Sequence, residues 1–278
     1  MSLPQLATRE PGRDRCYDRL MLRHIPEEPV SNAAVWCRRL AVFSLPVAAI
    51  AVLLARTNAV EPQACLAVLG GAIVVALIAL LLFFAACVVV WQEGRRGLGA
   101  ALGGAFLAAA TLGYPAYLAF EAVRLPVLSD VSTDTSDPPR FSASRAALAA
   151  RGGFTPAAFD PDLAERQRDS YPDVEPIVVD LEPDEAYQLV LETAASRGWR
   201  VIDQRPPGGR SGVGHLDFLD RTLVMGFSED IAVRLRPLAG QTRIDVRSAS
   251  RYGRHDFGAN AKRIRQFAEE LQAGLNEK

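Results

Sequence analysis

The sequence has few cysteines, almost no lysine, and three long stretches without charge. No cysteine follows residue 87 and none has metal-ligand spacing, which excludes a disulfide within the C-terminal half; they are Cys16, Cys37, Cys65 and Cys87. Lys262 and Lys278 are the only lysines among 31 basic residues, a bias typical of a GC-rich bacterial genome, so arginine counts alone carry little weight. The net charge of -1 provides no overall field for a nucleic acid. We expect no metal, no cofactor and no nucleic-acid partner.

The uncharged stretches predict a three-helix membrane anchor over residues 38–122. They cover residues 40–55, 64–91 and 98–120, and a helix needs about 20 apolar residues to cross the hydrocarbon core. The second and third are long enough. The first reaches spanning length because flanking arginines such as Arg56 can extend toward the headgroups. None of the three contains Asp, Glu, Lys, Arg or His, which argues against an ion or proton pathway. We expect the lipid bilayer to be the partner of this part.

The arginines that flank the stretches predict their orientation. Positive residues favour the cytoplasm. Four lie on the N-terminal flank and in the second loop, against two on the opposite side: Arg38, Arg39, Arg95 and Arg96, against Arg56 and Arg124. We expect a multi-pass inner-membrane protein with residues 1–37 as a cytoplasmic tail and the C-terminal domain in the periplasm. Met21 is a candidate start beside Met1, because the segment from Met21 onward already holds the positive flank.

Residues 175–278 predict a small α+β domain, preceded by an extended linker over residues 123–174. The linker is rich in Asp, Ser, Thr and Pro, and Asx-turns explain its aspartates better than a cation loop does. The domain's pattern predicts the order strand, helix, four strands, helix: 177–179, 183–197, 199–204, 215–219, 230–236, 241–250 and 259–275. Short turns imply an antiparallel sheet with both helices on one face, in a helix-grip or TBP-like layout.

Alternation along the last two strands gathers arginines on one face of this sheet. Ile231, Val233 and Leu235 point toward the expected core, so the residues between them point the other way. The arginines on that face, or just beyond it, are candidates for anion binding: Arg234, Arg236, Arg243, Arg247, Arg251 and Arg254. The face is either an ordinary solvated surface or a site for an anionic lipid or an acidic protein partner.

The segment between the last strand and the last helix combines glycines with polar residues: Ser248, Ser250, Gly253, His255, Asp256, Gly258 and Asn260. Its glycines permit unusual backbone angles, and Asp256 or Asn260 can cap the helix. A helix N-terminus also attracts anions. A Ser-His-Asp arrangement can be assembled from these residues, but no nucleophile elbow or phosphate loop accompanies it.

The run from Asp245 to Asn260, with Arg247-Ser248 and Ser250-Arg251, resembles the signature of the domain of unknown function 1499 family. Other pieces resemble further recurring parts of that family: Asp134-x-x-Asp137-Pro138-Pro139-Arg140-Phe141, Tyr171-Pro172 and Met225-Gly226-Phe227. The likeness covers residues 130–275. The three apolar stretches and Glu28-Pro29-Val30-Ser31 resemble a membrane-anchored bacterial branch. The resemblance implies the fold and the membrane setting, and it implies no reaction.

Three functions remain open from the sequence. The favoured one is a membrane-anchored envelope protein that acts as a non-catalytic binding or assembly module through its arginine-rich face. The alternative is a membrane-tethered hydrolase that uses His255 and Asp256. The third is an accessory subunit of a transporter.

Overall fold

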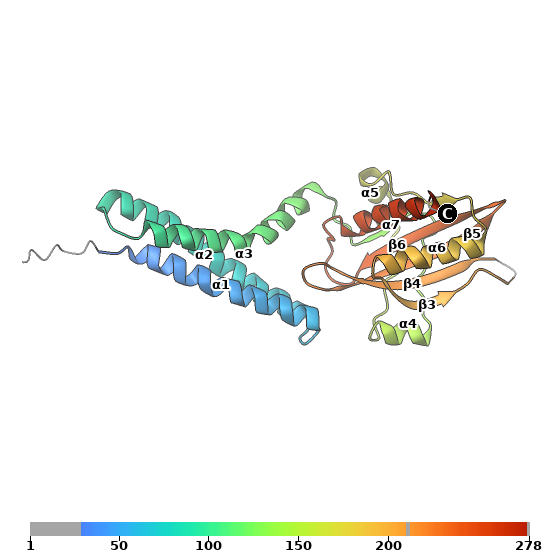
Figure 1. Cartoon of the computed structure of the whole chain (residues 1–278), viewed down its shortest axis with the longest axis horizontal. Coiled ribbons are helices and arrows are strands. Elements are labelled where there is room, and N and C mark those ends of the chain that lie inside the picture. The colour runs from blue at the N-terminus through green and yellow to red at the C-terminus, as the bar shows by residue number, and fades with distance from the viewer. Residues whose placement is uncertain (1–28, 210–211, 277–278) are drawn as a thin grey trace, which may run out of the picture.

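The computed structural model describes residues 29–209 and 212–276, and it shows a bundle of helices beside an α+β domain (Figure 1). The choice between Met1 and Met21 as the start, and the position of Cys16, lie outside the described residues. The bundle consists of α1 (Asn32–Thr57), α2 (Pro62–Glu93) and α3 (Leu98–Arg124). All three helices are long and apolar enough to cross a membrane, which confirms the predicted spans and indicates a membrane protein.

Small side chains hold these helices close together. Fully buried alanines lie between them: Ala41, Ala76, Ala79 and Ala108. Gly104 of α3 lies in the same interface, because a Cβ added there would be 2.6 Å from the Cys37 sulfur of α1. Ser44 and Thr111 share a hydrogen bond of 3.2 Å between α1 and α3. Small residues at the contact are the usual means by which helices approach closely in lipid.

The C-terminal half is built on an antiparallel sheet, which confirms the α+β fold class. Its strands in the described part of the chain are β1 (Asp130–Ser132), β2 (Ile177–Val179), β3 (Arg200–Arg205), β4 (Gly214–Arg221), β5 (Ser228–Leu238) and β6 (Gln241–Ser250). They lie in the order β1-β6-β5-β4-β3, and β2 also pairs with β6. β1 and β2 therefore follow each other along one edge of β6.

Two helices, α6 (Pro183–Ser196) and α7 (Ala259–Asn276), cover one face of the sheet (Figure 1). Ile231, Val233 and Leu235 of β5 are fully buried in the core beneath them, as the alternation predicts. Trp199 stacks on Phe267 of α7 with the ring centroids 5.1 Å apart. The side chains between the buried ones consequently emerge on the opposite face of the sheet.

Residues 133–159 cross that opposite face as a strap, which contains the short helix α4 (Arg145–Ala150). Strand β1 precedes the strap and α5 (Asp162–Ser170) follows it. The sequence predicts an extended linker over residues 123–174, whereas Leu128, Val131 and Tyr171 are buried in the domain core. Residues 123–174 are held to the sheet by a few apolar residues and scattered ion pairs. Such contacts leave no periodic pattern in the sequence.

Candidate functional site

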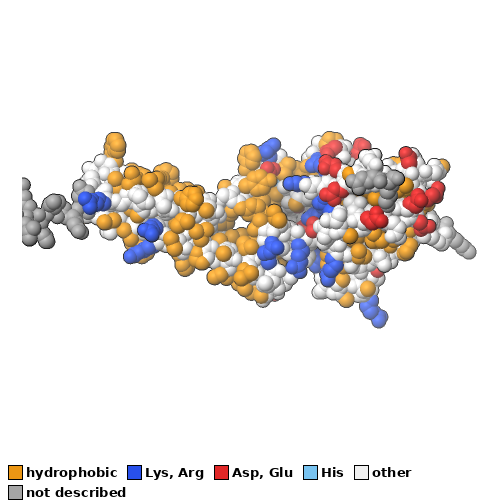
Figure 2. All heavy atoms as spheres, in the orientation of Figure 1, with side chains coloured by type: hydrophobic (Ala, Val, Ile, Leu, Met, Phe, Trp, Pro, Cys, Tyr) orange, Lys and Arg blue, Asp and Glu red, His pale blue; other side chains and the backbone are white. Residues whose placement is uncertain are grey.

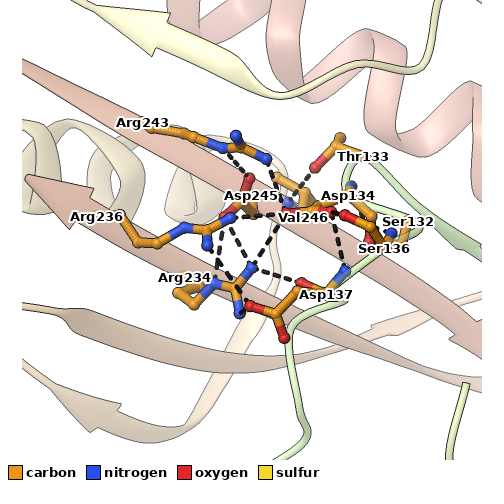
Figure 3. Close-up of polar contacts among 10 residues, drawn as sticks. All are labelled: Ser132, Thr133, Asp134, Ser136, Asp137, Arg234, Arg236, Arg243, Asp245 and Val246. Atoms are coloured by element: carbon orange, nitrogen blue, oxygen red, sulfur yellow. Dashed lines mark hydrogen bonds and ion pairs between the residues drawn. The ribbon is translucent and has the colours of Figure 1, made fainter. Parts of the chain in front are cut away.

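Three arginines of the predicted face surround the buried carboxylate of Asp245 (Figure 3). The Asp245 side chain has no exposed surface, and its Oδ1 accepts a hydrogen bond of 2.7 Å from Arg243 Nε. Its Oδ2 lies 3.0 Å from Arg234 Nη2 and 2.7 Å from Arg236 Nη2. The pairing of β5 with β6 places Arg234 directly opposite Asp245. Strand register and one shared carboxylate therefore fix the three guanidinium groups.

The strap supplies two more carboxylates to this cluster. Asp134 Oδ2 lies 2.7 Å from Arg236 Nη2 and 2.8 Å from Arg243 Nη2. Asp137 Oδ2 lies 2.9 Å from Arg234 Nη1. The other oxygen of Asp134 closes an Asx-turn with the residues after it, which confirms the turn interpretation. Burial acts to raise the pKa of Asp134, but the hydrogen bonds of this turn and of Arg236 lower it to about 2. Three carboxylates balance three guanidinium groups, so the cluster docks the strap.

Arg247 fastens the strap at a second point, between two aromatic rings. Its guanidinium carbon lies 4.6 Å from the ring centroid of Phe141 and 5.5 Å from that of Phe159. Its Nε lies 3.0 Å from Asp130 Oδ1, and two further nitrogens donate to backbone carbonyls of the strap. Burial raises the pKa of Asp130, against the hydrogen bond and charge of Arg247. Only 3 % of the Arg247 side chain is exposed, so its guanidinium group is used in the contacts that hold the strap.

Arg151, the residue after α4, is the third fastening point. Its Nη2 lies 2.6 Å from Asp217 Oδ2 and its Nε lies 2.8 Å from Asp230 Oδ1, and its side chain is fully buried. Arg251 also binds Asp230, through Nε at 2.6 Å and Nη2 at 3.0 Å. The Arg251 guanidinium carbon lies 4.9 Å from the ring centroid of Phe154, a strap residue. Two buried aspartates of the sheet are thus neutralised by one arginine of the strap and one that directly follows β6.

The loop after β6 leads into α7 and supplies its capping residue. Asp256 caps the helix, because its two carboxylate oxygens accept hydrogen bonds of 2.9 Å from Gly258 N and Asn260 N. Burial raises the pKa of Asp256, and these hydrogen bonds oppose the rise. Gly253 and Gly258 have φ angles of 86° and 77°, a region that glycine adopts without strain. Arg254 is exposed in the same loop. The predicted capping role is confirmed for Asp256.

His255 is not hydrogen-bonded to either serine of this segment in the part of the chain that the structure describes. Ser248 Oγ donates to Asn260 Oδ1 at 2.7 Å, and Ser250 Oγ donates to Glu229 Oε2 at 2.6 Å. His255 Nδ1 accepts a hydrogen bond from a backbone amide of its own loop. The two serines are therefore committed to structural hydrogen bonds, and His255 Nε2 is buried without a hydrogen-bond partner among the described residues. The described residues of this segment form no Ser-His-Asp relay.

Glu229 predicts a pH dependence of stability. Burial raises its pKa to about 7, against the opposing charge of Arg263 and the hydrogen bond from Ser250. Because the folded pKa lies above the ordinary 4.5, the stabilisation is complete below pH 4.5 and is lost as the pH rises through 7. We expect Glu229→Gln to flatten the fall in melting temperature of the full chain between about pH 5 and pH 8. Glu185→Gln, an exposed control, should keep the wild-type curve; identical curves for both variants would contradict the assignment.

Two open cavities flank the strap around Phe141. The first has a volume of about 360 Å³, and Arg140, Arg205, His215 and Arg234 help to line it. The second, of about 550 Å³, shares Arg140 and Phe141 with the first and continues along residues 155–159. We call the two together the strap cleft. Arg234 of the arginine face lines the first cavity, and Arg247 lines the second.

Arg140 and Arg205 differ from the paired arginines of this face. Both are exposed, and the side chain of neither has a hydrogen bond or an ion pair with any residue that the structure describes. His215 lies beside them in the first cavity, with its Nε2 2.9 Å from Asp217 Oδ1, and Asp217 thereby fixes the orientation of the ring. Asp137, also in the lining, already pairs with Arg234. Two free guanidinium forks suit a phosphate or carboxylate group.

The structure distributes the sequence candidates unevenly. Five of the six candidate arginines bind carboxylates, and Arg254 lies exposed before α7. Arg140 belongs to one of the family-like motifs, but Arg205 and Arg151 are absent from the sequence candidates. The strand register could have identified Arg205 as a candidate, because the pairing of β3 with β4 places Arg205 opposite His215. No sequence signal marks Arg151, whose partners are 66 and 79 residues away.

Three apolar helices followed by an α+β domain with an antiparallel sheet define the class as a membrane protein with a folded C-terminal domain. Residues 130–271 match the family model described as protein of unknown function (DUF1499). Because the match covers just over half of the chain, the chain belongs to this family. No curated protein matches the chain. The matched residues begin at β1, so the family's unit includes the strap and its fastening points.

Proposed function

We propose that this protein is a membrane-anchored binding module whose strap cleft takes the phosphate or carboxylate group of a water-soluble ligand. One observation carries the proposal: Arg140 and Arg205 lie unpaired in a single cavity. Elsewhere on this face, arginines such as Arg247 and Arg151 are neutralised by aspartates. The other arginines of this face are already paired with carboxylates. The guanidinium groups of Arg140 and Arg205 are therefore available to an anion. Ion pairs with a guanidinium fork are strong and directional.

The position of the cleft supports a ligand from the aqueous compartment. His215 stands near the start of β4, whereas Arg221 at its end donates a hydrogen bond to the Arg56 carbonyl of α1. β4 has eight residues, so roughly 20 Å separate the cleft from this contact with the helices. A headgroup of the surrounding bilayer is therefore too far away to fill the first cavity.

The compartment and the division of the chain are part of the same proposal. The arginine distribution around α1, α2 and α3 supports an inner-membrane protein with its N-terminus in the cytoplasm and its α+β domain in the periplasm. The anchor over residues 38–122 would then hold a soluble unit that begins near Leu125. A reporter that is active only in the cytoplasm, fused after Lys278, should be silent; activity there would reverse the orientation.

Inorganic phosphate is a direct probe of the cleft. For the full chain in detergent micelles, phosphate should raise the melting temperature more than chloride does at equal ionic strength. The double variant Arg140→Gln with Arg205→Gln should weaken the apparent affinity at least tenfold. Each hydrogen bond to a charged group contributes about 1.5–3 kcal/mol, and about 1.4 kcal/mol is a tenfold change. A parallel titration with acetate shows whether a carboxylate replaces phosphate.

A matched control removes the same charge from two exposed arginines outside the cleft, in Arg145→Gln with Arg254→Gln. This variant should keep the wild-type response to phosphate. It also tests the helix N-terminus beside Arg254 as an anion site. The proposal fails if the control loses the response as fully as the cleft variant does, or if phosphate and chloride act alike on the wild type.

A further inference from the structure

The loop between β4 and β5, residues 222–227, carries an apolar tip at the end of the domain that meets the helices. Gly226 N and Phe227 N donate to the carbonyl and hydroxyl oxygens of Thr222, at 3.0 and 2.9 Å, which closes the loop into a compact turn. Within the turn, Met225 is buried, whereas Leu223 is 88 % exposed. A single exposed leucine is ordinary on a protein surface, so its meaning here depends on what the loop lies against.

Hydrogen bonds join this loop to the end of α1. Arg56 Nη1 donates to the carbonyl oxygens of Leu223 and Val224, at 2.5 and 3.3 Å, and Arg221 Nη1 donates to the Arg56 carbonyl at 3.3 Å. Gly226 has a φ of 68°, and a Cβ there would lie 3.3 Å from Arg56 Cα. The glycine of the family-like Met225-Gly226-Phe227 motif thus permits the close approach of loop and helix.

The loop also reaches the apolar part of the helices. Val224, Met225 and Phe227 form one cluster with Val52 of α1 and Leu69 of α2, among others. Val52 precedes Arg56 by four residues, which is about 6 Å along a helix. Both Val52 and Leu69 lie within the uncharged stretches. A loop that packs against them lies at the depth of the headgroup layer, which is roughly 5–8 Å thick on each side.

A second loop, between β6 and α7, stands beside the first. Tyr252 lies next to Phe227 with ring centroids 5.4 Å apart, and Tyr252 and Phe257 are 40 % and 37 % exposed. Gly258 lies against Leu125, where the chain leaves α3. Figure 2 shows basic side chains gathered where the helices meet the domain, and acidic ones toward its far end. Aromatic rings with arginines are the usual composition of a surface that contacts headgroups.

We infer that the 222–227 loop inserts into the headgroup layer of the bilayer that the chain's own helices span, with Leu223 at its tip. The domain is then held to the membrane at two places, the exit of α3 and this loop. It cannot swing freely on a single tether, and the strap cleft is held away from the bilayer. The inference is independent of what the cleft binds.

Nitroxide labels test the depth of the loop in the full chain. Leu223→Cys is labelled in a chain whose native cysteines are alanine, reconstituted in nanodiscs that contain phosphatidylglycerol. The matched control is Leu238→Cys at the end of β5, next to the β5–β6 turn, where the leucine is 47 % exposed. We expect the label at 223 to collide more with oxygen than with a water-soluble nickel complex, and the label at 238 to show the reverse.

Two outcomes would overturn the inference. Equal access of the nickel complex to both labels would place the loop in water. Shielding of the 223 label from both oxygen and nickel would show that a protein surface, such as a second copy of the chain, covers it. A variant with its native cysteines intact gives an independent readout: Leu223→Asp should speed amide hydrogen exchange of residues 222–227 in nanodiscs at least tenfold, and Leu238→Asp should leave it unchanged.

Discussion

Replacing Arg151 with methionine is expected to lower the free energy of unfolding of the α+β domain by about 3–5 kcal/mol. The change removes a guanidinium group that compensates two buried carboxylates. The Arg151 side chain has no exposed surface, and Asp217 and Asp230 are 0 % and 1 % exposed. Methionine retains most of the apolar stem and so separates the loss of charge from the loss of volume. The measurement is the melting temperature of the full chain in detergent micelles, together with hydrogen exchange in the strap.

Two variants make this result specific. Arg200→Met changes an exposed arginine that donates to the carbonyl of Ala150, close to the same helix, and should cost less than about 1 kcal/mol. Adding Asp217→Asn to Arg151→Met removes the uncompensated charge, because Arg251 still pairs with Asp230, and should recover part of the lost stability. If Arg151→Met melted like Arg200→Met, the buried ion pairs would not hold the strap.

Replacing Arg247 with alanine is expected to release the strap from the sheet. The change leaves Asp130 without its partner and opens a space between Phe141 and Phe159, where the guanidinium lies. Loss of one partner from a buried pair costs about 3–5 kcal/mol, and the lost packing adds to this. Limited proteolysis should then cut residues 133–159 much faster than in the wild type, while the helix-covered core resists.

Arg247→Lys is the informative companion of this variant. Lysine keeps the positive charge but cannot present two parallel donors to Asp130 or stack a flat group on Phe141, so we expect it to rescue less than half of the loss. The control is Arg140→Ala, which removes an unpaired arginine from the strap itself and should leave its proteolysis unchanged. Equal cleavage in Arg247→Ala and Arg140→Ala would contradict the role of Arg247 as a fastening point.

The sheet and its helices could be predicted from the sequence because their signals are local. Alternation such as Ile231, Val233, Leu235 sets which face is buried, and the periodic apolar residues of α7 set its covered side. Proximity to the helix start was also enough to name Asp256 and Asn260 as capping candidates for α7, of which the structure shows Asp256 in that role. Each of these features depends on residues that are a few positions apart, which a sequence pattern can express.

The strap could not be predicted in the same way. Its composition is that of a linker, and the contacts that fold it join residues far apart, such as Arg247 with Asp130 and Arg151 with Asp217. The sequence predicted the arginine face but not that its arginines are paired. Several of the carboxylates that pair with them come from a segment with no strand or helix pattern. The folded chain shows which arginines of this face are paired, and among the described residues it leaves the side chains of Arg140 and Arg205 without a partner in the first cavity.

Nitrogen-15 NMR of the arginine side chains during a titration of the full chain with inorganic phosphate tests the strap cleft most directly. We expect the Nε resonances of Arg140 and Arg205 to shift together and to saturate with one dissociation constant. Those of Arg151 and Arg247, which are themselves buried and held by aspartates, should stay in place. Shifts that fail to saturate, or that spread equally over exposed arginines such as Arg145 and Arg254, would contradict a ligand site in the cleft.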